Sequence, residues 1–343
     1  GGVCIERFGE ELEMLPTKTR PKKLVLIGTD GKEYNYLLKG REDLHLDERI
    51  MQLLRVVNGM LRTDRTTRAY PAVRARNYNV LPLGPRAGLI QWVEGATPLF
   101  SLYKGWQLRQ HAAAALKAEG AAQQQPGGSA PPTAVKADSK GSATDTGAST
   151  ASTATADALS AAAGEKEMVV RPAEIFYSRM TPALQAAGLS STQSRRHWPH
   201  EVLRKVHAEL VNETPRDLIA QELWLQSADS HESWLKTQAF ARSCAVMSML
   251  GYAIGLGDRH LDNILLDLTS GELLHIDYNV CFEKGLRLKV AETVPFRMTH
   301  TMQAALGVGG TDGVFTACCE SVLRVLRSSK ETLLTLLEAF VYD

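Results

Sequence analysis

The sequence predicts an α+β protein of two lobes, a smaller one with an antiparallel sheet and one helix, and a larger one that is mostly helical. The smaller lobe is indicated by two β-prone runs, 22–27 and 33–38, because the residues from Gly28 to Gly31 between them are typical of a hairpin turn. The next run, 46–61, has apolar residues at helical spacing. Helical patterns late in the chain indicate the larger lobe. They cover residues 202–211 and 234–256.

A long segment of biased composition interrupts these patterns. Residues 112–167 consist mainly of Ala, Ser, Thr, Gly, Gln and Pro, with almost no large apolar side chains. Such a composition cannot support a packed core, so we expect a disordered insertion, although Ala112 to Ala115 can extend the preceding helix. We place the smaller lobe and the hinge between the lobes at residues 1–93. The larger lobe then takes residues 94–111 and 168–343.

The overall composition favours an intracellular enzyme. The formal net charge of +1 argues against an electrostatic grip on nucleic acid or on an anionic membrane. The five cysteines, two of them adjacent at Cys318 and Cys319, form neither a disulfide framework nor a Cys-x-x-Cys metal site. No apolar run is long enough to span a membrane, and the first residues do not resemble a signal peptide. We expect a cytoplasmic or nuclear protein.

The segment 257–263, with the sequence GDRHLDN, spaces its polar side chains as phosphoryl transfer requires. Asp258 and Asn263 repeat the Asp-x-x-x-x-Asn interval of a protein-kinase catalytic loop, in which the Asp takes the acceptor hydroxyl and the Asn binds a metal ion. Asp277, in the segment LHIDYN, supplies a second metal ligand. Mg²⁺ prefers such oxygen ligands and neutralises phosphate charge. The sequence therefore predicts transfer of phosphate from ATP, with Mg²⁺ or Mn²⁺.

A predicted hairpin brings these residues together. The β-prone runs 264–267 and 272–276 are joined by Thr269, Ser270 and Gly271, so Asn263 and Asp277 are expected at the same end. The alternative is that the three polar residues only cap loops and a strand end, which is the usual role of scattered Asp and Asn. Their combined spacing favours the catalytic interpretation.

These motifs resemble those of the phosphatidylinositol 3-kinase-related protein kinases, and the resemblance extends almost from end to end. Within this family, residues 277–285 are most similar to the branch that acts in nonsense-mediated mRNA decay, and the TOR branch is the next most similar. The resemblance implies the two-lobed fold of the phosphatidylinositol 3- and 4-kinases. The other segments that carry it are 36–40 (YLLKG), 43–49 (DLHLDER), 88–93 (GLIQWV) and 337–343 (LEAFVYD).

Lys39 follows the second strand of the first hairpin, where its ammonium group can reach the ATP phosphates. No Gly-x-Gly-x-x-Gly or Walker A sequence precedes it. The resemblance implies instead that residues 17–20, which include Lys18, cover the nucleotide. It also makes Asp47, early in the next helix, the expected partner of Lys39. Solvated surface charge is the alternative for Lys18 and Lys39.

The adenine of ATP needs an apolar slot with backbone donors and acceptors. By resemblance, the runs 80–83 and 89–93 look like the strands that lead into the hinge, and Gln91, Trp92 and Val93 line this slot. Tyr78 is expected to close its inner wall. Burial in the core is an equally good explanation for the two aromatic residues when they are judged without the family.

His260 lies two residues after Asp258. This position suggests that it donates to a γ-phosphate oxygen or supports Asp258, a role that the resemblance favours. A structural hydrogen bond is the alternative. We expect Arg259 to brace the backbone of the site and Asp262 to cap the loop.

Residues 277–299 are expected to form the activation segment. A lipid kinase needs a strongly basic patch here for an inositol phosphate head group. The basic residues of this segment are instead spread out and mixed with Glu283 and Glu292, which favours a protein substrate. They include Lys284, Arg287 and Lys289.

The substrate and the partners are implied only by the resemblance. It indicates Ser or Thr followed by Gln as the target, the RNA helicase of nonsense-mediated mRNA decay as a protein substrate, and regulatory subunits of a larger complex. No basic aromatic platform is present, so we expect no direct contact with nucleic acid and none with a membrane. A TOR-like growth-signalling kinase, a phosphoinositide lipid kinase and an inactive kinase-like scaffold remain alternatives.

Overall fold

The computed structural model describes residues 2–16, 19–123, 169–190 and 195–342. The chain forms two compact units. The first unit comprises residues 1–102 and 211–343, and the second comprises residues 103–210. The first unit contains both sheets and every segment in which the sequence predicts a catalytic or metal-binding residue.

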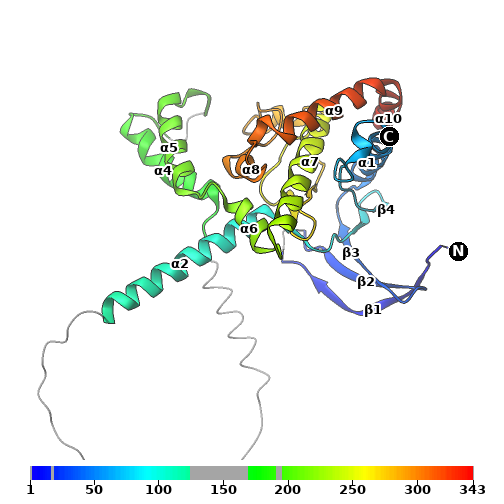
Figure 1. Ribbon diagram of the computed structural model, residues 1–343, viewed down its shortest axis with the longest axis horizontal. Helices are drawn as coiled ribbons and strands as arrows, with labels where there is room; N and C mark the ends of the chain where they lie inside the picture. Colours follow the sequence, from blue (N-terminus) through cyan, green and yellow to red (C-terminus); the bar gives the residue numbers. More distant parts are fainter. Residues whose placement is uncertain (1, 17–18, 124–168, 191–194, 343) are drawn as a thin grey trace, which may run out of the picture. The chain divides into compact units, whose positions relative to one another are not determined.

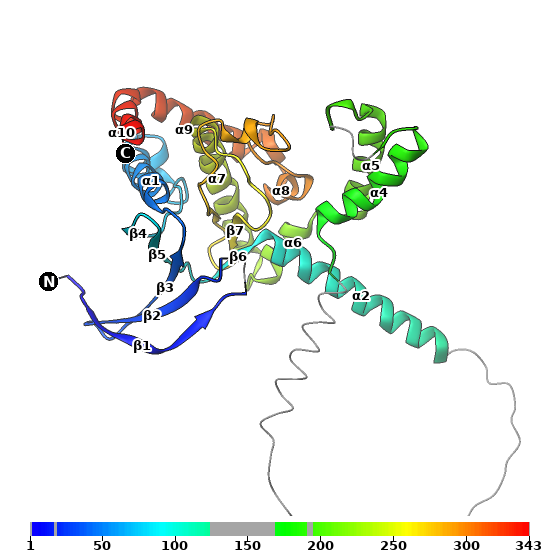
Figure 2. The same ribbon diagram turned by 180° about the vertical axis from the view of Figure 1, so that it is seen from behind.

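The larger sheet is antiparallel and has the strand order β1-β2-β3-β5-β4 (Figure 1; all five strands are labelled in Figure 2). The predicted hairpin is confirmed, because β2 and β3 pair from Lys22 with Leu38 to Ile27 with Glu33. Gly31 in its turn has a φ of +74°, which glycine adopts without strain. The strands are β1 (Ile5–Met14), β2 (Lys22–Gly28), β3 (Glu33–Gly40), β4 (Val80–Gly84) and β5 (Ala87–Gln91).

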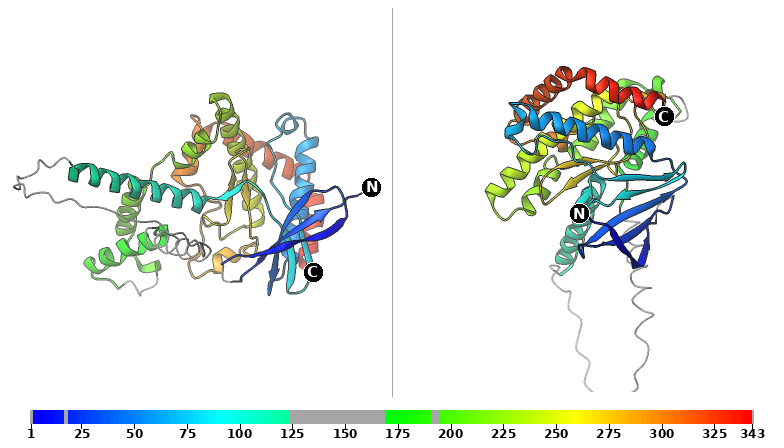
Figure 3. Two further views of the ribbon diagram at one scale, coloured as in Figure 1. Left: turned by 90° about the horizontal axis from the view of Figure 1, so that it is seen from below. Right: turned by 90° about the vertical axis from the view of Figure 1, so that its right-hand side faces the viewer.

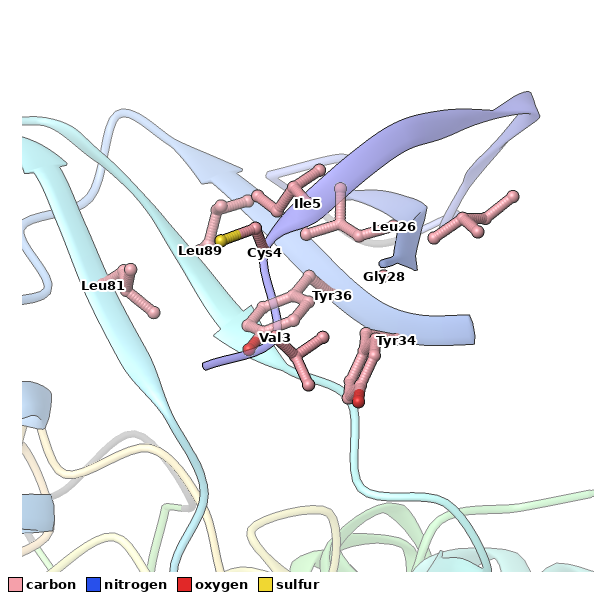
Figure 4. Close-up of a pocket in the computed structure, with 10 residues that line it drawn as sticks. Val3, Cys4, Ile5, Leu26, Gly28, Tyr34, Tyr36, Leu81 and Leu89 are labelled. Carbon is pink, nitrogen blue, oxygen red and sulfur yellow. The ribbon is translucent and has the colours of Figure 1, made fainter. Parts of the chain in front are cut away.

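Strand β1 lies at the edge of this sheet and was not expected from the sequence. Nine of its ten residues are exposed, and charged residues interrupt its apolar ones, so it lacks the alternation of a half-buried strand. Beside it, the sheet carries an apolar hollow of about 230 Å³ (Figure 4). Its lining includes Val3, Ile5, Leu26, Tyr36, Leu81 and Leu89.

Helix α1 (His45–Thr63) packs against β4 within the first unit. The predicted apolar face is confirmed, because Ile50, Leu53, Leu54 and Val57 are all buried. The helix also contacts α9 (Val314–Ser328) and α10 (Lys330–Tyr342), beside which it lies in the right-hand view of Figure 3. The first turn of α1 carries Asp47, which is buried with the apolar residues.

The predicted helix at 234–256 is α7 (Ser230–Ile254), a mostly buried helix that packs against α9 (Figure 2). The Asp229 side chain accepts a hydrogen bond from Glu232 N at its start. Gly255 ends it with a φ of +59°. The rest of the unit includes the strands β6 (Ala96–Pro98), β7 (Ile264–Asp267) and β8 (Leu273–His275), the helices α6 (Leu218–Leu225) and α8 (His300–Ala305), and short 3₁₀ turns at Thr67–Ala69, Lys284–Arg287 and Gly310–Asp312.

The second unit has its own small core, formed by Met180, Leu184, Trp198 and Val206. Helix α2 (Leu99–Gln123) begins in the first unit and continues past residue 112, the expected start of the insertion. The remainder of that insertion, 124–167, lies outside the described residues. The other elements are α4 (Pro172–Ala186), a 3₁₀ turn at Arg195–His197 and α5 (His200–Glu213), the helix expected at 202–211.

The helices in the described part of the chain are too short or too polar to cross a membrane.

Candidate active site

The hairpin expected after the catalytic loop is confirmed. Strands β7 and β8 pair from Ile264 with His275 to Leu266 with Leu273. Just beyond the first pair, Ile276 N donates to Asn263 O at 3.1 Å. Asn263 and Ile276 are therefore paired at this end of the hairpin, and Asp277 is the next residue after Ile276.

Asp258 and Asp277 both have a left-handed backbone, with φ values of +55° and +60°. Such a conformation is costly for residues other than glycine and persists where surrounding contacts enforce it, often at functional sites. Asp258 N donates to both carboxylate oxygens of Glu292, at 2.9 and 3.0 Å. Asp258 O accepts from Asn263 Nδ2 at 3.0 Å. The backbone of Asp258 is thus held on both sides.

Arg259 braces the site, as expected. Its buried guanidinium donates to Gly257 O at 2.8 Å and to Ile276 O at 2.8 Å. It also donates to Asn263 O at 3.4 Å and to Asp277 O. One side chain therefore joins the catalytic loop to the segment that carries Asp277, because its donors form a rigid fork.

The expected ion pair between Lys39 and Asp47 is not formed. Lys39 Nζ lies 3.1 Å from Glu42 Oε2, three residues along the chain. Asp47 is only 3% exposed, and its Oδ1 accepts a hydrogen bond from Tyr278 N at 3.3 Å. The start of α1 turns Asp47 towards the Asp277 segment, so the nearer Glu42 takes the lysine.

Burial raises the pKa of Asp47 from 3.8 to about 6. The Tyr278 N–H and the charge of Lys39 oppose this rise, whereas the charges of Asp277 and Glu42 add to it. Tyr78, expected as an inner wall, is also buried, which raises the pKa of its hydroxyl well above 10. Tyr278, Asp47 and Asp277 add to that shift. Asp47, Tyr78 and Asp277, which come from three separate segments, therefore lie close enough to influence one another electrostatically.

Lys39 also lines a basic hollow of about 860 Å³. Thr19 and Arg20, which the resemblance places over the nucleotide, line the same hollow together with Lys22 and Arg41. Such a cluster of cations suits phosphate groups. Lys18 lies outside the described residues.

At the expected hinge, two predicted residues make structural hydrogen bonds. Gln91 Oε1 accepts from Asn79 N at 3.0 Å, and Trp92 N donates to Asn35 O at 2.8 Å. The Trp92 side chain is 36% exposed, and Lys23 Nζ lies 5.1 Å from its ring centre. Val93 follows and is half-buried. The strand pairing thus orients the hinge, while contact with adenine stays a prediction.

His260 is half exposed, with 51% of its side chain accessible. Its Nδ1 accepts a hydrogen bond from Asp262 N at 3.2 Å, and Asp262 Oδ2 lies 3.7 Å from the same nitrogen. An accepting Nδ1 places the proton of a neutral ring on Nε2, which is then a donor. This tautomer suits the predicted donation to phosphate.

The donor set fits a divalent cation held together with a nucleotide. Among the residues that the structure describes, no group of three or more His, Cys, Asp or Glu could hold a metal ion. A nucleotide-bound Mg²⁺ needs only one or two protein oxygens, because phosphates and water complete its coordination. Asn263 uses its Nδ2 for Asp258, so its Oδ1 is the oxygen that remains, and Asp277 offers a carboxylate. Lys39 and Arg20 line the basic hollow, so their positive charges are of the kind that phosphate groups need.

Oxygen side chains of the kind that hold a divalent cation, and a cluster of cations that suits phosphate, are the two parts that a site for transfer of the terminal phosphate of a nucleoside triphosphate needs. The fold and the site therefore define a phosphotransferase. A family model described as phosphatidylinositol 3- and 4-kinase matches residues 33–343. The chain belongs to this family and is a kinase domain, which confirms the family and the fold class expected from the sequence.

Individual relatives agree with this assignment. Serine/threonine-protein kinase SMG1 of Danio rerio is 51% identical over 341 residues, which are 99% of this chain and 8% of that protein. Serine/threonine-protein kinase Smg1 of Drosophila melanogaster is 43% identical over 99% of this chain and 9% of that protein. Serine/threonine-protein kinase TOR of Oryza sativa subsp. japonica is 33% identical over 99% of this chain and 11% of that protein.

A solved structure described as the FAT and kinase domain of CtTel1 superposes with a TM-score of 0.69 at 27% identity, over 99% of this chain and 19% of that chain. The chain spans 8–11% of the length of the three curated relatives above.

Proposed function

We propose that this chain is the catalytic domain of a serine/threonine protein kinase that transfers the γ-phosphate of ATP to protein hydroxyl groups. The observation that carries the proposal is the bracing by Arg259, whose guanidinium binds the carbonyl of Gly257, directly before Asp258, and the carbonyls of Ile276 and Asp277. Catalysis of phosphoryl transfer is mostly positioning and charge neutralisation, so a rigid link between base and cation ligand is what the reaction needs.

Each residue has a separate task in this proposal. Asp258 orients the acceptor hydroxyl and takes its proton. Asn263 Oδ1 and the Asp277 carboxylate hold Mg²⁺ or Mn²⁺, which, when bound with ATP, neutralises phosphate charge. Lys39 binds phosphate, and Glu42 orients the Lys39 side chain. His260 donates from Nε2 to a phosphate oxygen.

The expected adenine slot completes the nucleotide site. Tyr78, Trp92 and Val93 are proposed to contact the base. Tyr78 is buried, and the charges of Asp47 and Asp277 act on its hydroxyl. This supports a position at the inner wall of the adenine slot, beside the proposed cation ligand Asp277.

The proposed substrates are Ser or Thr residues followed by Gln, in the RNA helicase of nonsense-mediated mRNA decay. Identity of 41–51% to the Smg1 proteins, against 33% to the TOR proteins, supports this branch. Regulatory subunits, a cytoplasmic or nuclear location, and no direct contact with nucleic acid or membrane belong to the same proposal. The mixed charges of residues 283–292 support a protein substrate over a lipid.

The test measures transfer of labelled phosphate from ATP, with Mg²⁺ or Mn²⁺, to three acceptors. They are a Ser-Gln peptide, the same peptide with Gln replaced, and vesicles that contain phosphoinositides. Labelling of the first acceptor alone is expected. Labelling of the vesicles would make the chain a lipid kinase, and labelling of both peptides alike would remove the Gln requirement.

Asp258→Asn is the control, because Asn tolerates the φ of +55° better than Ala does. It should lower turnover about 10²- to 10⁴-fold with little change in ATP binding. Asp277→Asn should weaken binding of the cation and nucleotide as well. Equal loss of ATP binding in both variants would contradict the separate roles.

A further inference from the structure

Glu292 lies in the expected activation segment, 34 residues after Asp258, and its side chain reaches the catalytic loop. Both carboxylate oxygens accept the backbone N–H of Asp258, at 2.9 and 3.0 Å. Hydrogen bonds to an ionised acceptor are stronger than neutral ones. The contact joins two segments that must both be in place during phosphoryl transfer.

The neighbouring glycines make room for this carboxylate. A Cβ atom at Gly257 would overlap Glu292 Oε2 and would come within 3.0 Å of Val280 Cγ1. A Cβ at Gly285 would lie 2.8 Å from the same carboxylate oxygen. Gly257 N also donates to Val280 O at 2.8 Å. The start of the catalytic loop is therefore packed against the activation segment and fitted to the Glu292 side chain.

The backbone of Asp258 needs such a restraint. Its φ of +55° is unfavourable for a residue with a side chain, so the loop relaxes unless its contacts hold it. On its other side, Asp258 O accepts from Asn263 Nδ2. Without Glu292, the N–H of Asp258 loses its carboxylate partner, and the direction of the Asp258 side chain is no longer determined from both sides.

We propose that Glu292 is a positioning residue for phosphoryl transfer. It holds Asp258 in the conformation that presents its carboxylate to the acceptor hydroxyl, and it makes turnover depend on the fold of the activation segment. The inference rests on the proposed role of Asp258. Glu292 touches neither nucleotide nor substrate in this scheme, so its effect falls on kcat and leaves ATP binding unchanged.

The test compares Glu292→Ala, Glu292→Gln and Gly257→Ala in the full-length protein. The readouts are kcat with a Ser-Gln peptide, KM for ATP, and Kd for ATP. Glu292→Ala should lower kcat about 10- to 100-fold, with KM and Kd for ATP within about twofold. Glu292→Gln keeps an acceptor oxygen and should retain more activity than Glu292→Ala. Gly257→Ala should displace the carboxylate and resemble Glu292→Ala.

A double variant shows whether Gly257→Ala and Glu292→Ala disturb the same contact or cause two independent defects. If Gly257→Ala acts by displacing Glu292, then Gly257→Ala combined with Glu292→Ala should be no slower than the slower single variant. Glu283→Gln is the matched control, because it removes one exposed carboxylate from the same segment. It should keep kcat within about twofold. Thermal unfolding of each variant shows whether it is folded, and the nearly isosteric Glu292→Gln remains informative if Glu292→Ala is not.

Three results would overturn the inference. They are an unchanged kcat in Glu292→Ala, a Kd for ATP that weakens in proportion to kcat, and losses that multiply in the double variant. Asp258→Asn distinguishes the two proposals. If it stays active, the proposed role of Asp258 fails; if it is inactive while Glu292→Ala is fully active, only the role of Glu292 fails.

Discussion

Lys39 is paired with Glu42, with Nζ and Oε2 3.1 Å apart, and not with Asp47, the carboxylate that the family resemblance favours. The side chains of Lys39 and Glu42 are 21% and 25% exposed, and Lys39 lines the basic hollow. Asp47 instead accepts a hydrogen bond from Tyr278 N. The two carboxylates thus have different tasks, one at the lysine and the other at the Asp277 segment.

Glu42→Gln should raise KM for ATP several-fold with little change in kcat, because Lys39 loses the charge that orients it towards the phosphates. Partly exposed pairs contribute modestly, so a larger effect is not expected. Asp43→Asn is the matched control, because Asp43 contacts His45 and is exposed. Steady-state kinetics at varied ATP concentration check this prediction. A KM that rises as much in Asp43→Asn would contradict it.

Asp47 should make the stability of the fold depend on pH. Its pKa is about 6 in the folded state and 3.8 as the ordinary value, so between these values the folded state binds more protons than the unfolded state. The free energy of unfolding therefore falls as the pH rises. The stabilisation is complete below pH 3.8 and is lost as the pH passes about 6.

Asp47→Asn removes this dependence and keeps an acceptor for Tyr278 N. At pH 7.5 the variant should be more stable than the wild type, by about 3 kcal/mol at most. At pH 4 the difference should vanish. Urea unfolding across this pH range measures both values, and a variant that is less stable at pH 7.5 would show that the charged form of Asp47 is needed by the fold.

Arg259→Lys should impair both folding and turnover. A lysine has one ammonium group, which cannot reach all four carbonyls that the guanidinium fork binds. Each buried carbonyl left unpaired costs about 1–3 kcal/mol. We expect a lower melting temperature and a loss of turnover together with weaker ATP binding, in contrast to Glu292→Ala. Thermal unfolding and ATP titration are the measurements, and unchanged ATP binding would argue against the shared brace.

Much of the site could be predicted from the sequence because its determinants are local. The β7 and β8 runs, with their Gly-containing turn, indicate a hairpin, and the hairpin brings Asp277 back to Asn263. The apolar spacing of α1 likewise indicates its buried face.

Other features depend on how distant segments meet. The hydrogen bond from Asp258 N to Glu292 joins residues that are 34 positions apart, and no periodicity in the sequence predicts it. The partner of Lys39 depends on how the chain turns between the end of β3 and the start of α1, and the spacing of residues in the sequence does not determine that turn. Glu42 could have been found only by considering every carboxylate within reach, including one three residues away.

Arg74 and Arg76 both pair with Glu272, which is far from them in the sequence. The Glu272 side chain is 4% exposed and accepts from Arg74 Nε at 2.7 Å and from Arg76 Nη1 at 2.8 Å. Burial raises its pKa, but the two guanidinium groups outweigh burial and hold it below the ordinary value of 4.5.

Glu272→Gln should therefore lower the free energy of unfolding at pH 7 by about 1–3 kcal/mol, because the buried side of this contact loses its charge. Arg74→Ala should cost less, because Arg74 is 51% exposed and Arg76 still neutralises Glu272. The contribution of Glu272 is present above pH 4.5 and is lost as the pH falls, so the two variants should converge in acid. Urea unfolding at pH 7 and at successively lower pH values below 4.5 follows this loss as the pH passes through the lowered pKa of Glu272. Equal losses for both substitutions at pH 7 would mean that the exposed Arg74, not the buried carboxylate, governs the contact.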